Sequence, residues 1–186
     1  MLMKNQPITF ITGNENKAKY VQKWIEWPLE HQKLNLQEIQ SLELSEVVED
    51  KVRRAYETIR SPVLVEDVSL VFAAYHYRLP GPFIKWYLEV FSPAELCGLL
   101  DKSNTRQAKA EVEFAYFDGS NLLIARGERL GVIVERPQGK SVFGFNPIFQ
   151  PEGWDKTWGE MDLEEEEQCS MRRPALAELR QKLAQM

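Results

Sequence analysis

The chain has 186 residues, of which 44% are hydrophobic and 27% charged, and its formal net charge at pH 7 is −5. This length suits one domain, or one domain with two lobes, while the acidic balance argues against general nucleic-acid binding, which needs a basic face. With two cysteines at no paired spacing, no signal-peptide layout and no apolar run long enough to cross a membrane, the sequence predicts a cytoplasmic protein without a nucleic-acid or membrane partner.

The chain opens with a predicted strand, turn and helix. Residues 7–12 are β-prone, and apolar residues recur at helical spacing over 18–25 after a short turn. Such a junction directs backbone N–H groups and the positive end of a helix dipole toward a ligand, which favours phosphate. The P-loop pattern is absent, and a plain turn before a capped helix is the alternative reading of Thr12, Gly13, Asn14 and Lys17.

A second strand and a longer helix are predicted next. Residues 34–39 form the expected strand, which carries Glu38. From Ser45 onward, apolar residues recur at i, i+4, i+7 and i+11 relative to Val48. This spacing predicts an amphipathic helix that ends near Arg60.

Two adjacent carboxylates interrupt the most apolar stretch of the chain. Residues 63–72 are apolar and β-branched, which predicts a buried strand, and Glu66 and Asp67 lie within it. A buried carboxylate is costly unless a partner compensates for its charge, and a metal ion is the expected partner. The alternative is a strand end at which both side chains reach solvent.

The next segments predict a rigid turn and two helices. Residues 79–82 contain the Pro-Gly-Pro turn, and the aromatic helix that follows over 83–90 carries Lys85, which could also be a simple surface charge. A capping box with proline at the first helical position then predicts a helix over 93–100.

The middle of the chain predicts an antiparallel meander. Its strands are expected over 108–116, 122–128 and 131–135, with a turn at residues 118–119. A glycine- and aromatic-rich stretch follows at 143–149. Aromatic rings beside a glycine can stack a flat ligand ring, and ordinary packing under a loop is the alternative.

The C-terminal part predicts one more helix. The acidic run 164–167 reads as a solvated face. The last helix is expected to begin near Ser170, to accept Pro174 in its first turn and to bury three leucines, Leu176, Leu179 and Leu183.

Six motifs follow one another in order along almost the whole chain. They are Thr12-Gly-Asn-x-x-Lys17, Glu38-Ile-Gln40, Val65-Glu-Asp67, Leu79-Pro-Gly-Pro-Phe-Ile-Lys85, Phe143-Gly-Phe-Asn-Pro147 and Ser170-Met-Arg172. Together they resemble the inosine triphosphate pyrophosphatase family.

The resemblance implies an α/β fold with a long central mixed β-sheet flanked by helices. It implies one domain over residues 1–186, with two lobes and an active-site cleft between them, commonly in a homodimer. It also implies magnesium-dependent hydrolysis of inosine, deoxyinosine and xanthosine triphosphates to monophosphate and pyrophosphate, which clears deaminated purines from the nucleotide pool.

The same resemblance assigns roles to individual residues. Glu38 and Asp67 match the magnesium ligands, with manganese as an alternative metal and Glu66 as a further candidate ligand. Asp67 is also the candidate for orienting the attacking water, and Lys17 and Lys51 are assigned to catalysis with it. The substrate-binding set comprises the phosphate loop, three further cations, the base platform and two base-reading positions: Thr12, Gly13, Asn14, Lys17, Lys51, Lys85, Arg172, Phe143, Gly144, Phe145, Asn146, Glu166 and Met171. In this set, Arg172 matches a contact either to the base or to a phosphate.

Three positions depart from the family pattern, all at the base-reading end. Asn146 stands where the family has aspartate, Glu166 where it has lysine and Met171 where it has histidine. Lysine and histidine donate hydrogen bonds to a keto oxygen, whereas ionised glutamate only accepts and methionine cannot donate. Relaxed or altered base choice is therefore expected, with Glu166 either accepting from an amino group or turning into solvent. The alternative functions are a nucleotide-binding sensor without turnover and a pyrophosphatase of the same fold for a modified or pyrimidine nucleotide.

Overall fold

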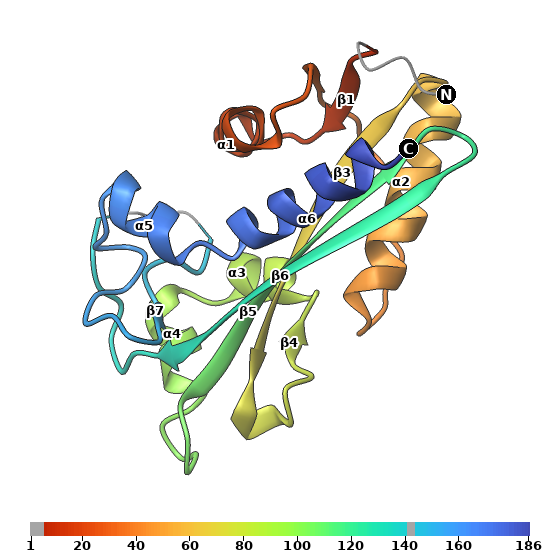
Figure 1. Ribbon diagram of the computed structural model, residues 1–186. Coiled ribbons are helices and arrows are strands. Elements are labelled where there is room, and N and C mark those ends of the chain that lie inside the picture. The colour runs from red at the N-terminus through yellow and green to blue at the C-terminus, as the bar shows by residue number, and fades with distance from the viewer. Residues whose placement is uncertain (1–5, 141–143) are drawn as a thin grey trace. The chain divides into compact units, whose positions relative to one another are not determined.

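The computed structural model describes residues 6–140 and 144–186 of the chain. In this described part, the strands form one mixed sheet of seven strands in the order β2-β1-β3-β5-β6-β7, with β4 paired to β3 (Figure 1). The strands are β1 (Ile8–Ile11), β2 (Leu29–Gln32), β3 (Val63–Phe72), β4 (Pro80–Gly81), β5 (Gln107–Phe117), β6 (Leu122–Ile133) and β7 (Phe149–Pro151). β1 runs parallel to β2 and β3, whereas β4 is antiparallel to β3 and β7 to β6, so the predicted mixed α/β sheet is confirmed.

Among the described residues, every α-helix except the one that contains the acidic run 164–167 lies close to where the sequence predicts it. The helices are α1 (Glu15–Ile25), α2 (Leu44–Ile59), α3 (Ile84–Val90), α4 (Pro93–Gly98), α5 (Leu163–Cys169) and α6 (Arg172–Ala184), with a short 3-10 turn η1 (Ala73–Tyr75). The predicted capping box is present at α4, where the Ser92 hydroxyl accepts from the Glu95 amide and the Glu95 carboxylate accepts in return from the Ser92 amide. The final helix buries the three expected leucines.

The chain forms two compact units. Unit 1 comprises the chain as far as Asp67 together with Val112–Gly127 and Arg172–Met186, and unit 2 comprises Val68–Glu111 and Glu128–Met171. Strands β3, β5 and β6 each contribute residues to both units. Most of the candidate polar residues lie in unit 1.

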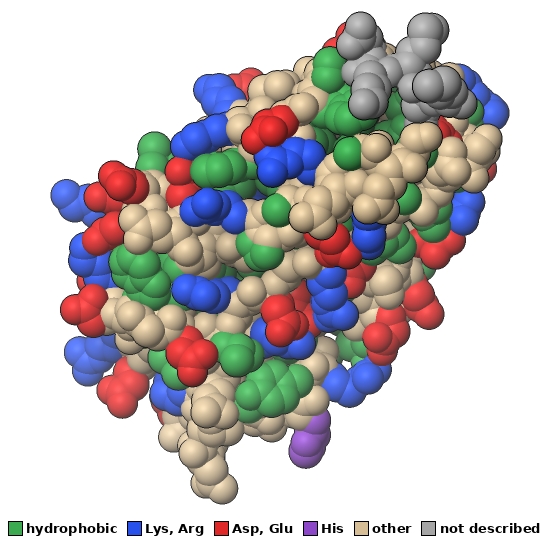
Figure 2. All heavy atoms as spheres, viewed as in Figure 1, with side chains coloured by type: hydrophobic (Ala, Val, Ile, Leu, Met, Phe, Trp, Pro, Cys, Tyr) green, Lys and Arg blue, Asp and Glu red, His purple; other side chains and the backbone are tan. Residues whose placement is uncertain are grey.

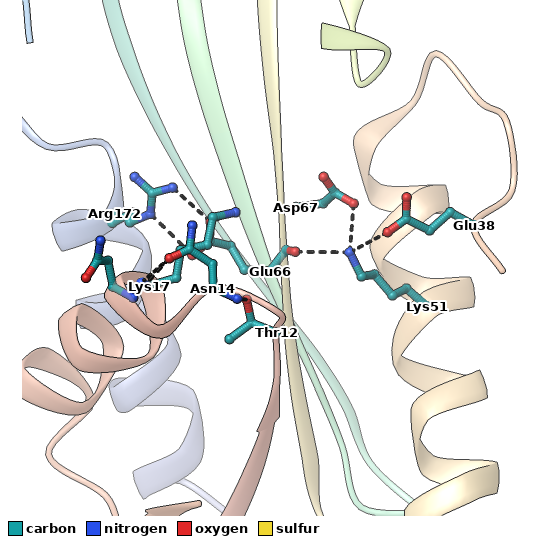
Figure 3. Close-up of polar contacts among 9 residues, drawn as sticks. Thr12, Asn14, Lys17, Glu38, Lys51, Glu66, Asp67 and Arg172 are labelled. Atoms are coloured by element: carbon teal, nitrogen blue, oxygen red, sulfur yellow. Dashed lines mark hydrogen bonds and ion pairs between the residues drawn. The ribbon is translucent and has the colours of Figure 1, made fainter. Parts of the chain in front are cut away.

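In unit 1, helices cover both sides of β3. The apolar stripe of α2, which includes Val48 and Val52, packs against Val63 and Val65 of β3. Helices α1 and α6 pack against each other on the opposite side of that strand (Figures 1 and 3). Both faces of β3 are therefore buried, which explains why its sequence is an almost continuous apolar run.

The second strand is not where the sequence predicts it. Residues 34–39 are irregular, and β2 lies at Leu29–Gln32, where each residue pairs with one residue of β1. Leu34 and Leu36 instead pack, partly buried, against the core beside α2. Their alternation with polar residues is the pattern of a half-buried strand. They form no strand because residues 29–32 already pair with this edge of β1.

The predicted meander is wrong in its third strand. Segments 122–128 and 131–135 belong largely to one long strand, β6, because the alternation of buried and exposed residues continues across Gly127 and Gly131. The partner of β6 at its far end is β7. Gly131 allows this pairing, since a Cβ there would lie 2.3 Å from the Gln150 carbonyl oxygen.

The surface in view carries mixed charge. Figure 2 shows Lys, Arg, Asp and Glu side chains interspersed over this face. Among the described helices, none combines the length and the apolar character needed to cross a bilayer.

Candidate functional site

The first polar element of the site is the turn between β1 and α1. Asn14 caps the helix, because its side-chain oxygen accepts from the amides of Asn16 at 2.9 Å and Lys17 at 3.2 Å. The Thr12 hydroxyl accepts in turn from the Asn14 amide at 3.1 Å. The capped helix predicted as the plain alternative is present, and its cap holds Lys17 in the first turn of α1.

The turn lies beside the two carboxylates of β3 because of the strand register. Ile11 is the last residue of β1 and pairs with Val65, so Glu66 and Asp67 come directly after the last paired position. Carboxyl ends of adjacent parallel strands meet at one edge of a sheet. The chain therefore brings residues 12–17 and 66–67 together, although about fifty residues separate them.

Glu66 forms the first of two charged clusters. Lys17 Nζ lies 2.9 Å from Glu66 Oε1, and the Arg172 guanidinium binds both carboxylate oxygens, with Nη2 2.9 Å from Oε1 and Nε 3.2 Å from Oε2. The Glu66 side chain is only 1% exposed. Burial by itself raises the pKa of this carboxyl, but the charges of Arg172 and Lys17 outweigh burial and lower the pKa from its ordinary 4.5 to about 2. We call Glu66, Lys17 and Arg172 the Glu66 cluster.

Asp67 belongs to the second cluster, which is centred on Lys51 of α2. Lys51 Nζ lies 2.9 Å from Glu38 Oε1 and 3.1 Å from Asp67 Oδ2, and it donates to the Glu66 carbonyl oxygen at 3.4 Å. Burial opposes the ammonium charge, yet Asp67 and Glu38 outweigh it, so the pKa of Lys51 is raised. Glu38 and Asp67, from separate segments, thus converge on one ammonium group. We call these three residues the Lys51 cluster.

The two clusters lie on opposite sides of β3. Consecutive side chains of a strand point to opposite faces, and Figure 3 shows Glu66 directed toward Lys17 and Arg172 while Asp67 points toward Lys51 and Glu38. Both acids lie within the strand, so the alternative of a solvent-exposed strand end does not apply. The partners seen in the structure are cationic side chains.

The Lys51 cluster has a donor set that suits magnesium. Among the described residues, no group of three or more His, Cys, Asp or Glu side chains is placed to hold a metal. Magnesium, however, is usually bound by one or two carboxylates, with waters and substrate phosphates completing its shell. Glu38 and Asp67 supply such a pair of oxygen donors.

Apart from Gly13, the remaining predicted residues that the structure describes lie in unit 2. Lys85 is exposed on α3, with Nζ 5.5 Å from the centre of the Trp86 ring, and Glu166 is partly exposed on α5. Phe145 is buried and packs on Phe149 and Trp158, as the packing alternative proposes. The other three differ in burial: Gly144 is exposed at φ 54°, whereas Asn146 and Met171 are buried. Phe143 lies outside the described residues.

Two side chains beside the turn between β1 and α1 are not indicated by any sequence motif. A Cβ on Gly13 would lie 3.6 Å from Cε of Lys33, so the Lys33 stem crosses this glycine. His31 Nε2 lies 2.7 Å from the Thr12 carbonyl oxygen. Correct placement of the second strand at Leu29–Gln32 would have revealed both, because its parallel pairing with β1 carries them to the loop.

The ionised Glu66 predicts loss of stability in acid. Because its folded pKa lies below its ordinary value, its stabilising effect is complete above about pH 4.5 and is lost as pH falls toward 2. We expect the free energy of unfolding of the wild type to exceed that of Glu66→Gln by about 3 kcal/mol at pH 7, and this difference to shrink steadily below pH 4.5. Urea unfolding of both proteins from pH 3 to 7 measures it, and a difference that does not change with pH would contradict the assignment.

The fold and the site together define an α/β protein in which a capped turn, two carboxylates of one strand and several cations meet where β1 ends. Residues 8–182 match the sequence model of the Ham1 family, and the chain belongs to this family.

Named relatives resemble nearly the whole chain. It is 40% identical over 180 residues to "Inosine triphosphate pyrophosphatase 2" of Trypanosoma cruzi, covering 95% of this chain and 91% of the relative. It is 42% identical over 182 residues to "Inosine triphosphate pyrophosphatase" of Pyricularia oryzae, covering 96% and 94%. Among solved structures, a HAM1 protein from Coxiella burnetii superposes with a TM-score of 0.84 at 24% identity, over 97% of this chain and 99% of that one, which supports the fold.

Proposed function

We propose that this protein is a nucleoside triphosphate pyrophosphatase that hydrolyses deaminated purine nucleoside triphosphates to the monophosphate and pyrophosphate. The observation that carries the proposal is the convergence of Glu38 and Asp67 on Lys51, across β3 from the Glu66 cluster that contains Lys17. The relatives named for inosine triphosphate hydrolysis, at 40% and 42% identity, support the same activity.

The residues of unit 1 would bind the triphosphate. A nucleoside triphosphate carries about four negative charges, and hydrolysis develops further charge on the phosphoryl oxygens. Ammonium and guanidinium groups fixed before the reaction stabilise this charge without reorganisation. Lys17, Lys51 and Arg172 are held in this way by carboxylates, and the Thr12–Asn14 turn would add backbone donors.

The carboxylates of the Lys51 cluster would hold the divalent cation and the water. Glu38 and Asp67 are the proposed ligands, for magnesium or, as an alternative, manganese. When bound, the metal polarises phosphoryl oxygens and lowers the pKa of a coordinated water. Asp67 would orient the attacking water and receive its proton. The water oxygen bonds to the α-phosphorus, the bond from that phosphorus to the bridging oxygen breaks, and its electron pair leaves with pyrophosphate.

The base contacts are part of the proposal. We assign Lys85, Gly144, Phe145, Asn146, Glu166 and Met171 to substrate recognition on the strength of the motifs alone. Burial of Met171 at 2% exposure supports an apolar rather than a donating role for this side chain. We also propose that the protein forms a homodimer and is located in the cytoplasm.

A substrate panel tests the activity and the base choice together. With magnesium present, we expect pyrophosphate release from inosine and xanthosine triphosphates. We expect kcat/KM for guanosine triphosphate to lie within about tenfold of theirs, because Glu166 and Met171 lack the hydrogen-bond donors that would discriminate against guanine. Initial rates over these three, adenosine and pyrimidine triphosphates provide the measurement. No pyrophosphate from any nucleotide would refute the proposed function.

A matched variant isolates the base-reading positions. The double substitution Glu166→Lys with Met171→His restores the donors of the family pattern and is expected to raise discrimination against guanosine triphosphate by about a hundredfold. A wild type that already prefers inosine and xanthosine over guanosine by that factor would contradict altered base reading and leave the hydrolase assignment intact.

A further inference from the structure

We infer that Glu66 is a positioning residue, which holds the Lys17 ammonium and the Arg172 guanidinium in one fixed arrangement for the phosphates and does not ligate the metal. The inference rests on the proposed function, since it names what prepares the cations of that site.

The contacts of Glu66 use both of its carboxylate oxygens. Oε1 is shared by Lys17 and Arg172 at 2.9 Å each, and Oε2 accepts from Arg172 Nε at 3.2 Å. The guanidinium therefore binds as a two-pronged fork, the geometry that best fixes an arginine. One buried anion thus joins the first turn of α1 to the first residue of α6.

The burial of the three side chains is graded. Glu66 is 1% exposed, whereas Lys17 is 20% and Arg172 13% exposed. The anion lies inside and each cation keeps part of its surface outside. An anionic ligand arriving from solvent would meet Lys17 and Arg172 first, and both would already be oriented.

The surroundings of Glu66 do not suit a metal ligand. A divalent cation bound to its oxygens would lie close to two positive side chains, whereas Glu38 and Asp67 together contact the single ammonium group of Lys51, so charge repulsion disfavours a metal more strongly at Glu66. The acid beside it, Asp67, points to the other face of β3, where Glu38 lies. The proposed metal pair can therefore form without Glu66.

Removing the charge of Glu66 should separate catalysis from binding. In Glu66→Gln, Lys17 and Arg172 lose their common anchor and can rotate, while the local positive charge rises by one. Misplacement of a catalytic group by about 1 Å costs on the order of a hundredfold in rate. An anion, in contrast, is attracted at least as strongly as before.

Three measurements on the 186-residue chain test this inference. Steady-state kinetics should show kcat for inosine triphosphate reduced about a hundredfold in Glu66→Gln, with KM unchanged or lower. Calorimetry with inorganic tripolyphosphate, without metal, should show that Glu66→Gln binds this anion with an affinity equal to that of the wild type or up to about tenfold higher. Manganese titration followed by electron paramagnetic resonance should give dissociation constants for the wild type and Glu66→Gln that agree within about twofold, because the proposed ligands Glu38 and Asp67 are unchanged.

Opposite results would overturn the inference. Manganese affinity that falls tenfold or more in Glu66→Gln would make Glu66 a metal ligand. Unchanged kcat, or loss of tripolyphosphate binding equal to the loss of kcat, would reduce the cluster to a structural role. Glu66→Asp keeps the charge on a shorter side chain, so partial recovery of kcat is expected, and it replaces Glu66→Gln if that variant does not fold.

Failure of the proposed function would be recognised separately. A wild type that binds tripolyphosphate and manganese but releases no pyrophosphate would refute the hydrolase assignment. The inference would then be judged on the two binding measurements: weaker tripolyphosphate or manganese binding by Glu66→Gln would overturn it, and preserved binding would support it.

Discussion

Asp67→Asn is expected to lower kcat for pyrophosphate release about a thousandfold, the range observed when an essential charged group of an active site is neutralised. Asparagine has nearly the same shape, but it has no charge to bind magnesium or to accept a proton from water. The Asp67 side chain is 21% exposed, so the amide can be solvated and the fold should persist. Steady-state kinetics at saturating magnesium, with thermal unfolding as a check, provide the measurement.

The matched control for this substitution is Asp101→Asn in unit 2. Asp101 also pairs with a cation, with Oδ1 3.3 Å from Arg106 Nη1, but it is 66% exposed and lies outside the proposed site. We expect its kcat to equal that of the wild type. Activity of Asp67→Asn within tenfold of the wild type would contradict the role of Asp67, and a nucleotide-binding sensor would still bind nucleotide in both proteins without releasing pyrophosphate.

Lys51→Met is expected to have the second largest effect, and in two directions. The rate should fall by about a hundredfold because one cation that stabilises the phosphoryl charge is lost. The affinity for manganese, in contrast, should rise by about tenfold, because Glu38 and Asp67 then face each other without the ammonium group that now lies 2.9 and 3.1 Å from them. Methionine preserves most of the buried stem. Kinetics and manganese titration of the same protein measure both effects.

The control for Lys51→Met is Lys182→Met on α6. Lys182 also forms an ion pair, with Glu178, and donates to the Ile124 carbonyl oxygen at 2.6 Å, but it belongs to neither charged cluster. Its substitution should leave rate and metal affinity unchanged. Weaker manganese binding in Lys51→Met would show that Lys51 organises the carboxylates rather than competing for their charge.

Most elements followed from local sequence patterns. The helix over 45–60 and the strand over 63–72 appear almost as expected, since an apolar stripe at helical spacing and an unbroken β-branched run each have one favourable backbone solution. The prediction of a strand over 34–39 was wrong because strand pairing depends on residues that are distant in the sequence. The alternating leucines show only that one side of this segment is buried. Whether the segment also pairs as a strand depends on which residues occupy the edge of β1, and residues 29–32 occupy it.

The sequence by itself determined the residue types of the site and their order: a turn before a helix, two adjacent acids in a buried strand, and lysines on the flanking helices. The alternation of a strand also sends Glu66 and Asp67 to opposite faces, whatever surrounds them. Only the tertiary structure decided the partner of each acid. Arg172 reaches Glu66 across 106 positions of sequence because α6 packs against α1, and Lys51 reaches Asp67 because α2 covers the other face. Packing of distant helices is a global property, so the pairing that fixes each carboxylate's charge and role arises with the fold.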